Sequence, residues 1–433
     1  MNREKSFIFQ LSRFVIFAGG MMVSLLFGGQ AALAASMPTT DQQILSLEGE
    51  IAKAPESIPL RNRLASAYLQ KGRETGDAAY FTRAERLLDK LLSQAANNGE
   101  ALGLRAWVAL FKHEFKEAAA WAEKAHAAQP KNSFHDGVLS DASLELGDYP
   151  KAIDYAQTML DLKQDQGAYS RAAHLRSLHG DIDGTIDLWR KAIRSGSPHS
   201  EHTAWCQVEW GDEYFNIGKE KEAEAAYRAA LKTFPGYHRA LAGLARLKAT
   251  EDQKTEAAQL YQQAIAVIPY PQYISALGDL YAQMGKAEEA RKQYALVEQI
   301  ALLDRINHLL YNRELALFYA DHDRNLDEAL RLIEREAAVR KDIYTEDALG
   351  WVYYKNGRYQ EADRAMQEAL RLGTKNPLLF YHAGMIARAL GKEKEARRLL
   401  KEALALNPHF HPIYQQSARE TLTALTTSKG GRS

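Results

Sequence analysis

Two pairs of histidines have the spacing at which side chains can share a metal ion. His199 and His202 lie three residues apart, and His409 and His411 lie two residues apart beside Pro408. A zinc site takes three or four protein ligands, so two imidazoles do not complete one. The sequence therefore predicts surface or capping histidines, with no metal site and no other cofactor.

The single cysteine and the acidic pairs are the other candidates for chemistry. Cys206 lies between Trp205 and Gln207, where it is either a reactive thiol or a small buried apolar side chain. Glu288-Glu289 is a lone pair of carboxylates, which is weak evidence for acid–base catalysis. The chain has no GxSxG elbow, HExxH helix, phosphate loop or CxxC. We therefore predict a buried thiol and a protein that is not an enzyme.

The balance of charged residues argues against one class of partner, nucleic acids. The chain has 433 residues, of which 46% are hydrophobic and 25% charged, so it can bury a large core. Lys+Arg and Asp+Glu each number 55. A nucleic-acid reader usually shows a basic excess or a basic stripe. We therefore predict no nucleic-acid partner.

The elements that hold these residues repeat along the chain. A small marker residue recurs at intervals of 33 or 34 residues, with two longer steps of 38 and 39. The markers are Ala84, Ala118, Ala152, Thr185, Ala223, Ala257, Ala290, Ala329, Ala362 and Ala396. A fixed period of this length predicts stacked helical hairpins.

A second small residue lies twelve positions before most markers, as Gly350 does before Ala362. Two antiparallel helices that cross closely leave room only for Gly, Ala or Ser, so both residues are expected at the crossing. Leu349, Tyr353 and Met366 fall at helical spacing on the inner face. We assign structural roles to Gly211, Ala223, Ala257, Gly278, Ala290, Gly350, Ala362, Gly384 and Ala396.

The turns and helix ends show the same repeat. Gly357 comes after Asn356 between the two helices, where glycine supplies a left-handed helix cap. Equivalent turns carry Gly147, Gly180, Gly218, Gly285 and Gly391. Prolines are expected to end the second helix of four hairpins: Pro130, Pro235, Pro269 and Pro408.

The pattern resembles the tetratricopeptide repeat family, most clearly in one hairpin. The matching residues are Trp210, Gly211, Tyr214, Ala223, Tyr227, Ala230 and Pro235. The resemblance implies an all-α, right-handed α-solenoid of about ten hairpins in one elongated domain. The expected hairpins lie near 58–98, 99–132, 133–165, 166–199, 204–237, 238–270, 271–304, 309–342, 343–376 and 377–410.

The segments between and beyond the hairpins differ in length. We expect an enlarged turn in "KGRETGDAAYFTR" of the first hairpin and longer linkers before Ala223 ("SGSPHSEHTAW") and Ala329. Residues 35–57 form a lead-in, and 411–425 are expected to be a helix that caps the last apolar face. Residues 426–433 have the composition of a disordered tail.

The N-terminus has the three-part layout of a secretory signal. Basic residues precede the apolar run "FVIFAGGMMVSLLFGG", and "AALAAS" comes next with small residues at Ala32 and Ala34. We predict export of a bacterial protein to the periplasm or outside the cell, with residues 1–34 removed. The alternative is an uncleaved membrane anchor, since the apolar run is nearly long enough to span a bilayer. Membrane contact is expected only in that case.

Several aromatic residues lie off the packing ladder, on the other side of the first helix of their hairpins; Trp107 is one. The family resemblance implies that this side lines a concave groove for peptides or partner helices. We predict a partner-binding surface at Asp347, Trp351, Tyr354, Tyr381, Met385 and Arg388. Exposed aromatics with arginine are typical of binding anchors. The alternative is that Trp351 packs against the adjoining hairpin and meets no ligand.

Two functions are compatible with the sequence. The first is an exported scaffold that binds a protein or peptide in the concave groove, within an envelope assembly or secretion complex. The second is a ligand-sensing or regulatory subunit of an enzyme complex. An enclosed pocket that holds a metabolite favours the second, and a co-purified polypeptide favours the first. Fold alone does not choose between them.

Overall fold

The computed structural model describes residues 38–306 and 312–427. The chain divides into two units, Met1–Thr39 and Thr40–Ser433, and only the second is described as a fold. The predicted signal peptide, residues 1–34, and residues 428–433 of the predicted tail lie outside the described residues. Within the described part, no helix is both long and apolar enough to cross a membrane.

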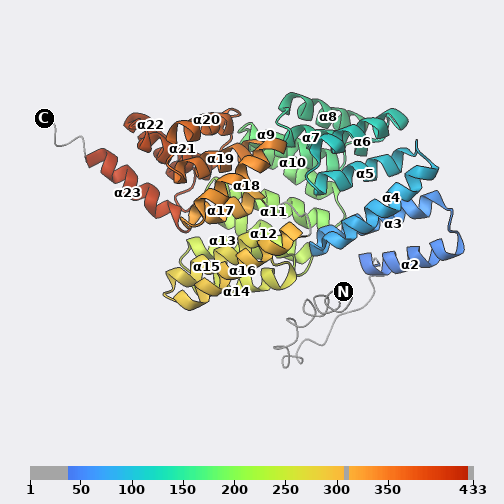
Figure 1. Ribbon diagram of the computed structural model, residues 1–433, viewed down its shortest axis with the longest axis horizontal. Helices are drawn as coiled ribbons and strands as arrows, with labels where there is room; N and C mark the ends of the chain where they lie inside the picture. The colour runs from blue at the N-terminus through green and yellow to red at the C-terminus, as the bar shows by residue number, and fades with distance from the viewer. Residues whose placement is uncertain (1–37, 307–311, 428–433) are drawn as a thin grey trace, which may run out of the picture. The chain divides into compact units, whose positions relative to one another are not determined.

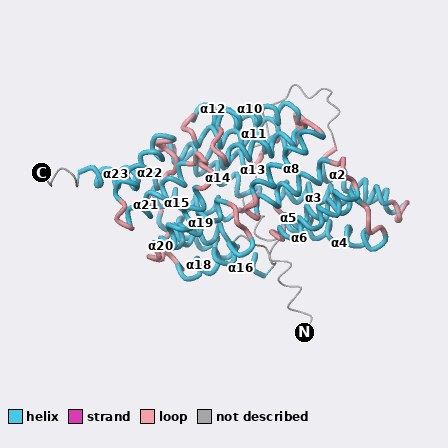
Figure 2. The backbone as a smooth tube through the Cα atoms, turned by 90° about the horizontal axis from the view of Figure 1, so that it is seen from above, coloured by secondary structure: helices cyan, strands magenta, loops and turns pink. Residues whose placement is uncertain are grey.

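The described residues of the second unit are helical throughout, with short loops between helices (Figures 1 and 2). This confirms the all-α solenoid. The helices are α2 (Thr40–Lys53), α3 (Ile58–Thr75), α4 (Ala78–Gln94), α5 (Gly99–Phe111), α6 (Phe115–Ala128), α7 (Ser133–Glu145), α8 (Tyr149–Leu162), α9 (Gln166–Leu178), α10 (Ile182–Ser195), α11 (Glu201–Asn216), α12 (Glu220–Thr233), α13 (His238–Thr250), α14 (Lys254–Val267), α15 (Pro271–Gln283), α16 (Ala287–Ile306), α17 (Asn312–Asp321), α18 (Leu326–Val339), α19 (Ile343–Lys355), α20 (Tyr359–Leu370), α21 (Pro377–Ala389), α22 (Glu393–Leu406) and α23 (Tyr414–Thr427).

Consecutive helices from α3 to α22 pair as antiparallel hairpins, and each hairpin packs on the next. We call the first helix of each hairpin its A helix and the second its B helix. Helix α2 packs on α3 before the first hairpin, and α23 packs on α22 after the last. Both end helices thus cover an apolar face of the stack, as a solenoid requires.

The small residues lie where the helices cross, as predicted. A Cβ added to Gly350 would lie 3.2 Å from the carbonyl oxygen of Ala362, so α19 and α20 are in near contact at this point. Ala362 has no exposed surface, and the same is true of Ala223, Ala257 and Ala396. The period of 34 residues therefore reports a closest approach of two helices, repeated along the stack.

Every A-to-B turn from α3 to α22 holds a residue in the left-handed region. The six predicted glycines are all there, with φ between 70° and 77°, and Gly76 adds a seventh at φ 67°. The remaining three turns use residues other than glycine, namely His113, Asp252 and Asp323. The turn conformation is thus kept along the stack even where its preferred residue is absent.

Two predicted loop lengths are wrong. The enlarged turn of the first hairpin does not exist, because α3 continues to Thr75 and α4 begins at Ala78. Most of its polar residues belong instead to the end of α3 and the start of α4, and Lys71, Arg73 and Glu74 are half-buried there. The linker before Ala223 is also shorter than predicted, since α11 begins at Glu201. Helices α6, α12, α14 and α22 do end two residues before their prolines, as predicted.

The superhelix returns onto itself after one turn. The backbone N–H of Lys341 donates to the carbonyl oxygen of Glu145 at 2.7 Å, 196 residues away. The Thr374 hydroxyl donates to the carbonyl oxygen of Leu178, again 196 residues away, and Asn407 Nδ2 donates to that of Phe215 at 2.6 Å, 192 residues away. The nearly constant offset means that successive turns stack along one seam, which closes the wall of the superhelix between these hairpins.

Charged groups reinforce this seam. Arg340 pairs with Glu145 at 2.5 Å and with Asp342 at 2.9 Å, and all three side chains are largely buried. The Tyr149 hydroxyl accepts a hydrogen bond of 2.9 Å from the backbone N–H of Ile343. The largest apolar cluster also crosses the seam, joining Tyr149 and Leu178 to residues of α19 to α23. Seam contacts therefore hold hairpins together that are distant in sequence.

Candidate binding surfaces inside the superhelix

The six residues of the predicted C-terminal surface lie on two neighbouring A helices, α19 and α21. The structure brings their rings together. The Trp351 and Tyr354 rings stack with centroids 4.9 Å apart, and the Trp351 and Tyr381 centroids are 5.9 Å apart. The predicted juxtaposition of the two helix stripes is thus present.

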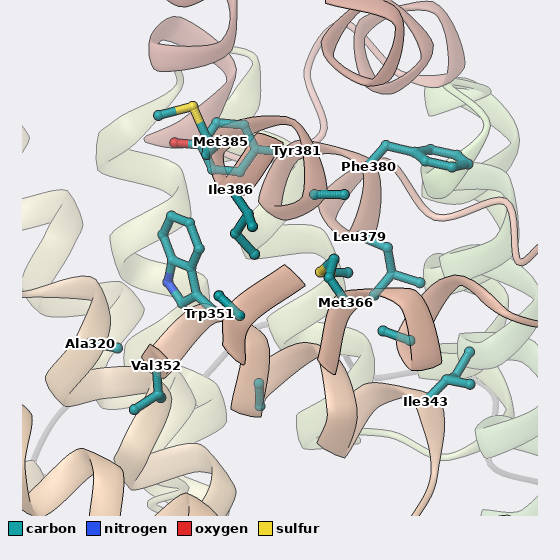
Figure 3. Close-up of a cluster of buried hydrophobic side chains, with 14 of the residues drawn as sticks. Ala320, Ile343, Trp351, Val352, Met366, Leu379, Phe380, Tyr381, Met385 and Ile386 are labelled. Carbon is teal, nitrogen blue, oxygen red and sulfur yellow. The ribbon is translucent and has the colours of Figure 1, made fainter. Parts of the chain in front are cut away.

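Trp351, however, lies in the core (Figure 3), with only 2% of its surface exposed. Its Nε1 donates a hydrogen bond of 2.8 Å to Asp321 Oδ1, and its ring stacks on His382 with centroids 4.2 Å apart. Burial raises the pKa of Asp321, and the hydrogen bonds from Tyr414 and Trp351 oppose that increase. Both faces and the polar edge of the indole are occupied by the protein itself.

Tyr381 and Met385 are covered by helix α23, including Tyr414, its first residue. The Tyr381 ring stacks on Tyr414 at 4.8 Å, and its hydroxyl donates to Ser417 Oγ at 3.1 Å. Burial raises the pKa of Tyr381 to about 12. Met385 Sδ lies 3.8 Å from the hydroxyl of Thr421. The terminal helix thus rests on the side chains that the sequence predicted to be open.

The remaining three residues of the predicted surface differ in how exposed they are. Asp347 is buried, with its carboxylate 2.8 Å from His382 Nδ1. Tyr354 is half-buried, and Arg388 is exposed while donating to the Thr421 hydroxyl at 3.1 Å. The expected exposure is therefore wrong for Asp347, Trp351, Tyr381 and Met385, because neighbouring hairpins and α23 cover them. Whether the surface binds a partner stays a prediction.

The open surface lies elsewhere, on the A helices of the N-terminal hairpins. A pocket of about 980 Å³ is lined mainly by helices α3, α5, α7, α9 and α11. We call it the luminal pocket. The residues that carry its chemistry are Arg73, Phe81, Trp107, Phe111, Phe134, Asp141, Glu145, Arg171, Glu201, Trp205, Glu209, Arg239 and Arg340.

One wall of the luminal pocket is aromatic. Phe81 and Phe111 stack with centroids 4.4 Å apart, and Trp107 lies 5.6 Å from Phe111 and 5.8 Å edge-on to Phe134. Phe111 is 36% exposed, the others are half-buried, and the guanidinium of Arg73 lies over Trp107. This wall presents fixed aromatic surface to a ligand at low conformational cost.

The rest of the pocket lining is largely charged, and most of these charges are paired. Arg171 forms a two-pronged interaction with Asp141, at 2.8 Å and 2.7 Å. Arg73 pairs with Glu201 at 2.9 Å, and the Glu201 carboxylate also accepts a hydrogen bond from Tyr237 at 2.8 Å. These pairs hold the side chains in place around the pocket.

Arg239 and Glu209 differ from these pairs. No hydrogen bond or ion pair among the described residues includes either side chain. Arg239 is exposed within the pocket, and Glu209 is half-buried. Burial, together with the like charge of Asp212, raises the pKa of Glu209. The charge of Arg239 acts to lower the pKa values of both Glu209 and Glu201, although it forms no ion pair with either carboxylate.

The sequence reasoning missed a polar motif that links neighbouring hairpins. The Tyr227 hydroxyl donates to Asp212 Oδ1 at 2.6 Å, and Arg246 of the next A helix binds the same oxygen at 2.5 Å. A second copy uses Tyr294, Asp279 and His322, with distances of 2.8 Å and 2.7 Å. The signal was available: in both copies an aspartate precedes a tyrosine by 15 residues.

The cysteine and two of the histidines that were candidates for chemistry are buried or paired with neighbouring residues. Cys206 is fully buried and burial raises the pKa of its thiol, so the prediction of a buried thiol is confirmed. His202 stands against Trp205, and burial lowers its pKa to about 4. His409 pairs with Glu220 across the seam at 2.7 Å. The described residues contain no group of three or more side chains placed to hold a metal ion.

Sequence comparison identifies the repeat. A tetratricopeptide repeat model matches residues 208–274 and 348–409. The TPR repeat-containing protein YpiA of Bacillus subtilis is 41% identical over 58 residues, covering 13% of this chain and 14% of that protein. The human protein O-mannosyl-transferase TMTC3 is 27% identical over 242 residues, covering 48% of this chain and 26% of that protein. The chain thus spans no more than about a quarter of these relatives.

Structural comparison extends the likeness over more of the chain. The human IFIT1 dimer with PPP-AAAA is similar at a TM-score of 0.50 and 18% identity, covering 76% of this chain and 78% of that one. The dimer with m7Gppp-AAAA gives a TM-score of 0.51 at 17% identity, covering 76% and 77%. At such identities the likeness shows a common fold of stacked helical hairpins.

Proposed function

We propose, from the premise that this chain is a tetratricopeptide-repeat protein, that it is an exported scaffold that binds a partner protein or peptide. The repeats and the solenoid fold support a role in protein interaction. The finer proposal is that the partner docks in the luminal pocket, within an envelope assembly or secretion complex of a bacterium. The observation that carries it is an open pocket with an aromatic wall, whereas the predicted C-terminal surface is covered.

The geometry of the pocket favours a polypeptide segment. Its lining comes from successive A helices, so contacts are spaced along the stack and suit an extended ligand. Aromatic side chains with arginine are the usual anchors of protein interfaces. Nothing in the repeat, the pocket or the ion pairs calls for catalysis, and we propose a non-enzymatic role.

Capture of the partner tests the function. The full chain is purified from its native envelope by affinity, and bound polypeptides are identified by mass spectrometry. Phe111→Ala removes the most exposed ring of the aromatic wall, and Ile153→Ala is the control, because Ile153 is 41% exposed on α8 and does not line the pocket. We expect Phe111→Ala to lower recovery of the partner at least tenfold, with no loss for the control. Equal recovery by both variants would contradict binding in the pocket.

Export is tested on the same preparation. Sequencing of the N-terminus should begin at residue 35 or 36, just after the small residues of "AALAAS". A chain that keeps its first methionine and partitions with membranes would instead support the anchor.

The second candidate is a ligand-sensing subunit. One observation favours it: Arg340 and Glu145, which pair across the seam, both line the luminal pocket, so the seam contributes to the wall around a ligand. A volume near 980 Å³ is also at the upper end of small-molecule sites. Native mass spectrometry of the purified chain distinguishes the two, through a bound metabolite or a bound polypeptide.

A further inference from the structure

A second pocket, of about 420 Å³, lies between the B helices α6 and α8 and shares no lining residue with the luminal pocket. Ala119 of α6 and Tyr155 of α8 line its two sides, and Leu139 and Leu146, in and just after α7, line the space between them. Val339, at the end of α18, adds an apolar side chain that is 43% exposed. We call this pocket the B-helix groove.

The B-helix groove takes its residues from both turns of the superhelix. Lys341 belongs to the connection between α18 and α19, and its backbone N–H donates to the carbonyl oxygen of Glu145 across the seam at 2.7 Å. A Cβ added to Gly147, in the α7–α8 turn, would lie 3.0 Å from the Cβ of Lys341. The groove is therefore complete only while the seam is closed, and a ligand bound in it stabilises the closed seam.

Three lysines and one aspartate line the end of the groove that lies at the seam. Lys116 and Lys151 lie in the first turns of α6 and α8, and Lys341 lies beside the α7–α8 turn. Lys151 pairs with Asp148 at 2.8 Å, whereas the side chains of Lys116 and Lys341 form no ion pair or hydrogen bond with a described residue. Burial raises the pKa of Glu346, and the charge of Lys341 opposes that increase without an ion pair. This end of the groove is thus basic, and the first turns of the two helices add partial positive charge.

The floor of the groove carries a hydroxyl without a partner at the same end. Ser143 lines the groove, is 8% exposed, and its Oγ forms no hydrogen bond with a described residue. Its carbonyl oxygen accepts a hydrogen bond of 2.9 Å from the N–H of Asp148, which places Ser143 at the start of α8. A buried polar group without a hydrogen bond costs free energy, so a ligand that bonds to this hydroxyl gains affinity.

The other end of the groove is mostly apolar and includes Tyr155. Glu123 is the charged group at this end, and it is exposed and forms no ion pair with a described residue. Seven residues of α6, about 10 Å along the helix, separate Glu123 from Lys116. The bond to Asp148 raises the pKa of Lys151, and the charge of Glu123 contributes last to that increase. The groove therefore has a basic end and an apolar body.

We propose that the B-helix groove binds a small amphiphilic anion, whose negative head group is held by the ammonium groups of Lys116 and Lys341. Its short apolar chain lies along Leu139 and Leu146, and the Ser143 hydroxyl donates a hydrogen bond to the head group. Charged donors bind an anionic head more strongly than a neutral one, and the chain gains from leaving water. A cavity near 420 Å³ lies within the range of small-molecule sites. This site is independent of partner binding in the luminal pocket.

Binding of defined probes to the full chain tests the proposal. The probes are octanoate, its neutral match octanamide, and acetate, which has the head group without the chain. Titration calorimetry should show that octanoate binds at least tenfold more tightly than either of the others. Hydrogen exchange gives a second measurement. Octanoate should slow the exchange of the Lys341 N–H at least threefold, because that N–H closes the seam beside the groove.

A pair of alanine variants tests the position of the apolar chain. Ala119→Leu places a larger side chain in the groove and should weaken octanoate binding at least tenfold. Ala120→Leu is the control, because Ala120 is exposed on the same helix and lines neither pocket. The control should bind octanoate within about twofold of the parent, and equal melting temperatures show that the fold is retained.

A pair of double variants tests the head group. Lys116→Gln with Lys341→Gln should abolish the preference for octanoate over octanamide while leaving the affinity for octanamide within about twofold. Lys394→Gln with Lys401→Gln is the control, because both lysines are exposed on α22, form no ion pair with a described residue and line neither pocket. The control makes the same change in net charge and should keep the preference.

Any of four results overturns the proposal. The first is equal binding of octanoate and octanamide to the parent chain, and the second is failure of octanoate to bind. The third is a preference for octanoate that survives the change of Lys116 and Lys341. The fourth is octanoate binding that Ala119→Leu leaves unchanged or that does not slow exchange at Lys341, since the anion then binds elsewhere. None of these results bears on the scaffold function, which the capture of a partner through Phe111 tests separately.

Discussion

Trp107 and Trp351 occupy the same position in two hairpins, yet they have different surroundings. Each comes one position after the small A-helix residue, Ala106 in one case and Gly350 in the other. Trp107 is half-buried in the aromatic wall of the luminal pocket. Trp351 is 2% exposed, between His382 and Tyr354, with Tyr414 at its edge.

The difference arises from the side chains that the next hairpins place against each tryptophan. Beside Trp107 the next A helix places Phe134 edge-on at 5.8 Å, and Arg73 lies over the ring, which leaves the indole half-buried. Beside Trp351 lie His382, then Tyr414 and the terminal helix α23. A repeat position therefore fixes the direction of a side chain, while its exposure depends on the side chains of the next one or two hairpins.

The largest expected effect contrasts the two tryptophans directly. Trp351→Ala removes a buried indole and leaves Asp321 without its Nε1 donor, which should cost roughly 3–5 kcal/mol of the free energy of unfolding. Trp107→Ala removes a half-exposed ring and should cost about 1–2 kcal/mol. Urea unfolding monitored by circular dichroism measures both. Similar losses for the two variants would contradict the distinction between an open and a covered region.

Breaking the buried ion pairs of the seam should give the next largest loss of stability. Arg340→Ala would leave Glu145 without its cation, while Asp342 keeps Arg313 at 3.5 Å, and breaking a buried pair typically costs roughly 3–5 kcal/mol. This value should be near the lower end, since Glu145 retains some solvent contact. Hydrogen exchange should speed up in α7 and α8 as well as in α18 and α19. Exchange that speeds up only around Arg340 would show that the seam does not couple the two turns.

Two histidines should make the stability of the chain depend on pH in opposite directions. A fall in pH should remove the contribution of His202, and a rise in pH that of His322. Burial lowers the pKa of His202 to about 4, so its contribution to stability is complete above pH 6.5 and is lost as the pH falls toward 4. Burial also acts to lower the pKa of His322, but the hydrogen bond to Asp279, the charge of that carboxylate, the bond to the Phe318 carbonyl and the charge of Asp321 together outweigh it and raise the pKa. That contribution is complete below pH 6.5 and is lost as the pH rises through the folded-state pKa.

Glutamine variants separate the two contributions. His202→Gln should flatten the dependence of the urea midpoint on pH between 4 and 6.5, and His322→Gln should flatten it above 6.5. If either variant keeps the slope of the parent in its own range, the corresponding environment is wrongly assigned.

The smallest expected change in stability comes from exchanging aspartate and glycine at a left-handed turn position. Asp252 adopts φ 62° in the α13–α14 turn, where seven of the other hairpins use glycine. Left-handed backbone costs a residue with a side chain roughly 1–2 kcal/mol, so Asp252→Gly should stabilise the chain by up to about 1 kcal/mol after the entropy of glycine is subtracted. Gly357→Asp, the reverse change, should destabilise. A neutral result for both would show that the turns tolerate either residue.

The repeat was predictable because it rests on local rules. Small residues at crossings, glycine in left-handed turns and prolines after helices act within one hairpin, and the residues that matter are close in sequence. The loop lengths before α4 and α11 were less predictable, since charged residues such as those of "KGRET" suit both turns and exposed helix faces.

The position of the open surface could not be predicted from the sequence. It depends on the seam, which joins residues about 196 positions apart, and on Tyr414 lying against Trp351. No local pattern specifies such contacts. The Asp–Tyr spacing of 15 residues was a usable signal, but its partners, Arg246 and His322, come from the next hairpins along the chain.

One pair of exposed arginines tests the central claim most directly. Arg239 lies in the luminal pocket and Arg388 on the covered C-terminal surface, and both are exposed, so either can be changed to glutamine without loss of the fold. The measurement is the affinity of each variant for the partner captured from the native envelope. Binding in the luminal pocket predicts at least a tenfold loss for Arg239→Gln and no more than a twofold change for Arg388→Gln. The reverse result would return the binding site to the C-terminal surface.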